Sequence, residues 1–106
     1  MTTSKRRSHK LRPAWRQRKE NYIAHLGEAS DDSILVSLAD KLDNARSTLR
    51  DLRIEGPALW QRFSTHDPFD HIWYYESLLE VYRQRTDSSM VGELDLVIDD
   101  IKRLVP

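Results

Sequence analysis

The residues from Leu35 to Arg46 read LVSLADKLDNAR and lie within the most regular helical pattern of the chain. From about Asp32 to Arg53, apolar residues recur three or four positions apart, which is typical of a helix with one buried side. The pattern predicts an amphipathic helix that ends before Gly56-Pro57. Its apolar residues are Leu35, Leu38, Leu42, Ala45, Leu49 and Leu52.

The rest of the chain also shows helical spacing, with no segment in which apolar and polar residues alternate cleanly. We therefore predict an all-α fold, a small bundle of about five helices. Beside the helix at 32–53, we expect helices at about 13–28, opened by Pro13, at 58–63, at 68–85 and through 91–105. The core candidates in the 68–85 segment are Phe69, Ile72, Tyr75, Leu79 and Tyr82.

Length and charge indicate one small helical domain preceded by a basic arm. The chain has 106 residues, no cysteine and a formal net charge of zero. Residues 1–20 contain eight Lys or Arg against one Glu, and residues 21–106 contain nine against sixteen acidic residues. We assign residues 1–12 to a flexible basic arm and residues 13–106 to the domain. The absence of cysteine and of a long apolar run favours a cytoplasmic protein with no membrane contact.

The basic arm could contact nucleic-acid phosphates, since such contacts require only charge and reach. However, no aromatic residue interleaves with its charges before Trp15. A solvated terminus is therefore the favoured interpretation, and a nucleic-acid partner is the alternative.

Residues 38–46 resemble the last metal-binding motif of the HD-domain phosphohydrolases, a superfamily that includes the RelA/SpoT-type guanosine tetraphosphate hydrolases. That motif runs approximately Leu-Ala-Asp-Lys/Arg-Leu-His-Asn-x-Arg, and this chain departs from it at Asp43, where histidine is usual. The likeness extends through residues 15–26, 49–53 and 73–75, and thus covers most of 13–105. It implies the fold of the C-terminal half of an HD domain.

The resemblance also implies a divalent metal, Mn²⁺ or Mg²⁺, held by two upstream histidines and two aspartates. Asp40 matches only the last of these ligands, and neither His9 nor His25 is followed by aspartate. Asn44 would face the nucleotide or its phosphates, and Ser47 could line the pocket. We therefore expect Asp40 to be a remnant ligand with low metal occupancy, in a chain that is inactive unless another polypeptide completes the site.

The polar side of the 32–53 helix lies opposite its leucine seam at about 100° per residue. Asp40, Asp43, Asn44 and Ser47 lie on that polar side, and we expect it to meet water. As an alternative to a remnant ligand, Asp40 is then simply a solvated carboxylate. Together, Asp40, Asp43 and Asn44 could at most bind an oxygen-ligated cation loosely.

The chain contains one literal His-Asp pair, His66-Asp67, which follows Asp40 and is itself followed by Pro68. Aspartate before proline is typical of a helix start, so we predict that Asp67 caps a helix and that Pro68 occupies its first position. The pair is therefore not expected to bind a metal.

Three functional hypotheses follow from the sequence. The first is the C-terminal part of an HD-type hydrolase of nucleotide phosphate or pyrophosphate linkages, with an N-terminal HD half or a second copy of the chain as partner. The second is a non-enzymatic helical interaction module. The third is a nucleic-acid-associated protein that acts through its basic arm.

Overall fold

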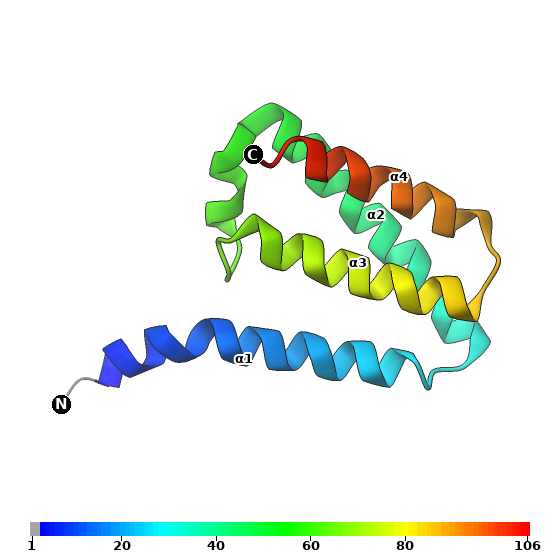
Figure 1. The fold of residues 1–106 in the computed structure, drawn as a ribbon, viewed down its shortest axis with the longest axis horizontal. Helices are drawn as coiled ribbons and strands as arrows, with labels where there is room; N and C mark the ends of the chain where they lie inside the picture. The colour runs from blue at the N-terminus through cyan, green and yellow to red at the C-terminus, as the bar shows by residue number, and fades with distance from the viewer. Residues whose placement is uncertain (1–2) are drawn as a thin grey trace.

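A computed structural model describes the backbone of residues 3–106 and the side chains of residues 13–106. The described chain is helical and contains no strand, as predicted (Figure 1). The predicted five helices correspond to four α-helices and one 3-10 helix in this part of the chain. These are α1 (Thr3–Leu26), α2 (Asp31–Glu55), η1 (Gly56–Arg62), α3 (Pro68–Arg85) and α4 (Ser89–Arg103).

The ends of α2 are set by local hydrogen bonds that its sequence supplies. The Ser30 hydroxyl accepts a hydrogen bond from the backbone N–H of Ser33, which satisfies one of the donors left free at a helix start. At the other end, Gly56 adopts φ 70°, which side chains disfavour, and its N–H donates to the Leu52 carbonyl. Helix α2 thus begins one residue earlier and ends two residues later than the predicted 32–53.

The core forms where α4 packs against both α2 and α3. In Figure 1, α2 and α4 lie on one side of α3, and α1 lies along its other side. The fully or almost fully buried residues include Ile34, Leu38, Leu42, Ala45 and Leu52 of α2, Leu78, Leu79 and Tyr82 of α3, and Leu94, Ile98 and Ile101 of α4.

Two predicted core residues are exposed. The buried side of α2 begins at Ile34, and Leu35 is 40% exposed. Both residues lie at the edges of the apolar seam, so a small rotation of the helix decides which one is covered. Phe69, in the first turn of α3, is also exposed.

Helix α1 begins at Thr3, and Pro13 lies within it instead of at its start. The described part of α1 is anchored by Trp15 and Leu26, which are buried. The Trp15 ring contacts the rings of His71 and Tyr74 on α3, with centroids 5.7 and 6.2 Å away. The side chains of residues 1–12 lie outside the described residues, and the predicted flexibility of the arm stays a prediction.

A chain of hydroxyl groups joins three helices near the end of α1. Ser37 on α2 lies 3.0 Å from the Tyr22 hydroxyl on α1 and 2.7 Å from the Tyr82 hydroxyl on α3. Because Tyr82 is buried, its hydroxyl needs such a partner.

No described helix has the length and apolar character that crossing a lipid bilayer requires.

Arg85 fastens the loop between α1 and α2 to the end of α3. Its guanidinium donates hydrogen bonds to the carbonyl oxygens of Gly27 (3.0 Å) and Ala29 (2.7 Å), and to an Asp31 carboxylate oxygen (3.1 Å). A planar guanidinium can make these contacts at once, which the single ammonium of lysine cannot match.

We expect Arg85→Ala to lower the free energy of unfolding by about 1–2 kcal/mol, because it leaves the loop carbonyls without their charged donor. Urea unfolding followed by circular dichroism measures this loss. Arg50→Ala is the matched control, since Arg50 is 66% exposed and pairs only with its neighbour Asp51. Equal stability losses for the two variants would contradict this role of Arg85.

Candidate functional site

Asp40 lies on the outer side of α2, away from the core. Its side chain is 74% exposed, and one carboxylate oxygen lies 3.7 Å from the Lys41 ammonium. Asp43 is exposed as well. Within the described residues, no three His, Cys, Asp or Glu side chains come close enough together to hold a metal ion. These residues therefore do not fit the metal that the resemblance implies.

The His66-Asp67 pair forms a helix start, as predicted. An Asp67 carboxylate oxygen accepts a hydrogen bond from the backbone N–H of Phe69 at 3.0 Å, and Pro68 is the first residue of α3. Asp67 thus has the role of an N-cap.

Asn44 is exposed, as expected for the polar side of this helix, but it also makes a hydrogen bond to a neighbouring helix. Its Oδ1 accepts a hydrogen bond of 2.5 Å from the Tyr75 hydroxyl on α3. Asn44 lies about 40° further round the helix than Asp40, which is enough to move its side chain from the solvent side to the edge of α3. Asp40, Asp43 and Asn44 are therefore not directed at one common point.

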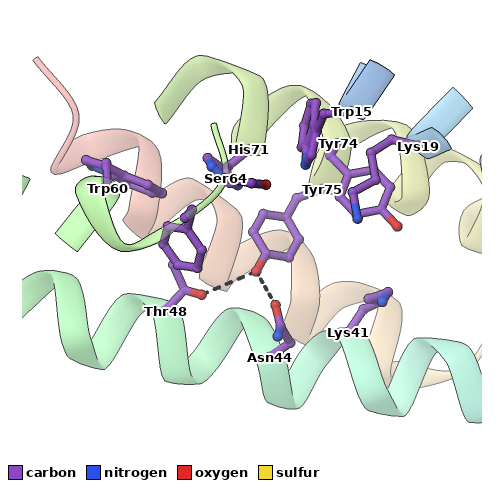
Figure 2. Close-up of a pocket in the computed structure, with 11 residues that line it drawn as sticks. Trp15, Lys19, Lys41, Asn44, Thr48, Trp60, Ser64, His71, Tyr74 and Tyr75 are labelled. Carbon is purple, nitrogen blue, oxygen red and sulfur yellow. Dashed lines mark hydrogen bonds between the residues drawn. The ribbon is translucent and has the colours of Figure 1, made fainter. Parts of the chain in front are cut away.

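Asn44 stands at the rim of a pocket of about 250 Å³ between α1, α2, α3 and the segment around η1 (Figure 2). Its aromatic lining comprises Trp15, Trp60, Phe63, His71, Tyr74 and Tyr75. The polar lining comprises Lys19, Lys41, Asn44, Thr48 and Ser64. Among the residues whose side chains the structure describes, two lysines and no carboxylate line this pocket, so the lining carries positive charge.

Lys19 is the cation that lacks an acidic partner at this pocket. Within residues 13–106, no carboxylate lies within ion-pair distance of its ammonium, which instead lies 4.8 Å from the centre of the Tyr74 ring. Partial burial lowers the pKa of Lys19, and the nearby charges of Lys41 and Arg18 lower it further. A bound anion would reverse these effects, because it would offset both the lost hydration and the repulsion.

Ser47, predicted to line a nucleotide pocket, is half-buried but does not belong to the lining of this one. Its neighbour Thr48 does belong to it, and the Thr48 hydroxyl lies 3.4 Å from the Tyr75 hydroxyl. The difference arises because successive residues of a helix point about 100° apart.

His71 forms part of the aromatic wall in its neutral state. Its Nε2 lies 2.9 Å from the Thr65 carbonyl oxygen, which can only accept, so Nε2 must donate. The imidazole stacks on Trp60 with centroids 5.4 Å apart. Burial lowers the pKa of His71, opposed by the Thr65 carbonyl and by the charge of Asp70.

Tyr74 also stays neutral at physiological pH. Burial raises its pKa to about 12, and the neighbouring tyrosines Tyr22 and Tyr75 add to this effect. The pocket thus offers uncharged aromatic faces beside its two ammonium groups.

Comparison with known proteins adds no relative from which a role could be transferred. No family model matches the sequence, and no curated protein matches it significantly. The resemblance to HD-type phosphohydrolases therefore remains an expectation based on the residues quoted above.

Sequence reasoning predicted Asn44 at this site but missed its partners. Lys19 was counted only among the charges of residues 1–20, and Tyr75 was predicted as a core residue, which it also is. Lys19 follows Trp15 by four positions, which places both on one side of a helix. That spacing was a signal that the lysine lies beside the aromatic residues.

The lowered pKa of His71 predicts that stability decreases in mild acid. Because the pKa of His71 is lower in the folded chain, protonation of this residue favours the unfolded chain. Its contribution to the free energy of unfolding is complete above the ordinary pKa of 6.5 and is lost as the pH falls through the lowered pKa. Urea unfolding at pH 7.5 and 5.5 should show a loss of stability that His71→Gln reduces. His66→Gln, at an exposed site nearby, should keep the wild-type dependence.

Proposed function

We propose that this chain is the C-terminal half of an HD-type phosphohydrolase fold and that it binds the phosphate groups of a nucleotide in the pocket beside Asn44. The observation that supports this best is the charge of that pocket. Asn44, the residue that the resemblance assigns to the nucleotide, shares the lining with Lys19 and Lys41 and with no carboxylate.

The chemistry of the lining suits a phosphate joined to a flat ring. Ammonium groups bind phosphate oxygens through charge-assisted hydrogen bonds. An aromatic face at the pocket, here that of half-buried Tyr74, can stack on a base. A volume of about 250 Å³ is at the small end for a ligand site, so the pocket would enclose only part of a nucleotide.

Hydrolysis is not part of what the chain is proposed to do alone. Asp40 supplies one exposed carboxylate, and a catalytic metal usually needs several protein ligands, commonly including imidazole. In this proposal, Mn²⁺ or Mg²⁺ would need ligands from an N-terminal HD half or from another polypeptide. No role for a metal is assigned to these residues by themselves.

Lys19→Ala should weaken binding of guanosine 5′-diphosphate about tenfold or more, because it removes a charge-assisted contact of about 1.5–3 kcal/mol. Isothermal titration calorimetry at low salt measures the dissociation constants. Arg50→Ala removes an exposed cation that does not line the pocket and should leave binding unchanged. The proposal fails if the wild-type chain does not bind the nucleotide, or if Lys19→Ala binds it equally well.

The purified chain should not hydrolyse guanosine tetraphosphate in the presence of Mn²⁺, and Asp40→Ala should leave that result unchanged. Release of pyrophosphate, followed by ion-exchange chromatography, measures this. Sustained turnover that disappears in Asp40→Ala would show that the metal site is complete within this chain.

The second candidate is a helical interaction module, which the exposed outer side of α2 favours. Val36 is 71% exposed there and lines a shallow groove with Tyr22, Ser33, Ser37 and Asp40. An apolar residue in such a groove is common at contacts between proteins, including self-association. The nucleic-acid alternative depends on residues 1–12, whose side chains lie outside the described part of the chain.

A further inference from the structure

We propose that Tyr75 is a positioning residue for Asn44: its hydroxyl holds the Asn44 amide with the oxygen turned inward, so that the amide N–H groups are presented to an anionic ligand. This inference rests on the proposed function, since it concerns the same pocket. It adds the reason why that pocket would select anions.

The hydrogen bond to Tyr75 gives the direction of the amide. The Tyr75 hydroxyl lies 2.5 Å from Asn44 Oδ1. An amide oxygen can only accept, so the Tyr75 hydroxyl is the donor.

The Tyr75 hydroxyl cannot donate to Asn44 and to Thr48 at the same time. A phenol has one hydrogen, and Tyr75 gives it to Asn44, so its oxygen can only accept from Thr48, 3.4 Å away. Tyr75 and Thr48 are both buried residues, so their ring and methyl group are held by the core. Figure 2 shows this row of polar groups, with the Tyr75 hydroxyl between Thr48 and Asn44.

The polar groups that remain available to a ligand in this pocket are then hydrogen-bond donors. With Oδ1 engaged by Tyr75, the part of the Asn44 amide that remains for a ligand is Nδ2 and its two hydrogens. Lys19 and Lys41 supply ammonium groups to the same pocket. Without the Tyr75 hydroxyl, the amide could turn its oxygen toward the Lys41 ammonium. The amide would then offer the anionic ligand no N–H group, and its oxygen would compete with that ligand for Lys41.

The experiment compares Tyr75→Phe, Asn44→Ala and the double variant, with inorganic pyrophosphate as the probe and calorimetry as the readout. Tyr75→Phe alone should weaken binding about three- to tenfold. In the Asn44→Ala background, Tyr75→Phe should have no further effect, because the hydroxyl then has no amide to position. A merely structural role of Tyr75 would instead give two losses that multiply.

Two further variants act as controls. Tyr22→Phe removes a tyrosine hydroxyl that bonds Ser37 and does not line this pocket, so pyrophosphate binding should stay within twofold of the wild type. Asn44→Asp keeps an acceptor for Tyr75 but replaces the donor with a negative oxygen, and it should abolish binding while the chain stays folded. Asn44→Asp gives the decisive comparison if Tyr75→Phe does not fold.

The outcomes separate this inference from the function on which it rests. If the wild-type chain binds neither pyrophosphate nor guanosine 5′-diphosphate, both proposals fall. If the wild type binds pyrophosphate but Tyr75→Phe binds it equally well, or the two losses multiply, only the role of Tyr75 is overturned. Retained binding by a folded Asn44→Asp variant would also overturn it.

Discussion

The burial of the apolar side of α2 is the constraint on which the site depends. Leu38, Leu42 and Ala45 are covered by α3 and α4, so the rotation of α2 about its axis is fixed by the core. Once that rotation is fixed, the directions of the polar side chains between these residues follow from helix geometry alone. Lys41 and Asn44 reach the α3 side, and Asp40 and Asp43 reach solvent.

The pocket also depends on how α1 is attached, since α1 contributes Lys19 and Trp15. α1 packs mainly on α3, through aromatic and cation contacts such as the Arg16 guanidinium 3.4 Å from the centre of the Trp73 ring. Contacts of this kind are each worth only about 0.5–2 kcal/mol. The hydrogen bonds of Arg85 and of Ser37 restrain the opposite end of α1 and its loop. The position of Lys19 over the pocket is therefore maintained by several modest interactions at both ends of the described segment.

Helical periodicity was enough to predict the helices, and the Asp67-Pro68 pair was enough to predict an N-cap, because these features depend on residues close in sequence. It was not enough to choose between Ile34 and Leu35, since both lie at the seam's edge and only the partner helices decide. The pocket could not be predicted as a unit, because Lys19, Asn44 and Tyr75 come from three helices. Their proximity is a property of how those helices cross, which no local spacing encodes. The start of α1 was also misplaced, since proline favours the first turn of a helix without excluding a position within one.

The two polar positions of the motif are physically independent in this chain. Asp40 and Asn44 are one turn apart, but one is solvated beside Lys41 and the other is hydrogen-bonded to a buried tyrosine. The carboxylate of Asp43, at the position where the motif that this segment resembles has histidine, therefore adds negative charge to the outer side of α2 and does not belong to the groups that line the pocket. A loss of metal ligands on the outer side of α2 would leave the donors on its inner side intact. The proposed phosphate binding would therefore not depend on a metal, because Lys41 and Asn44 are positioned by the packing of α2 and by Tyr75.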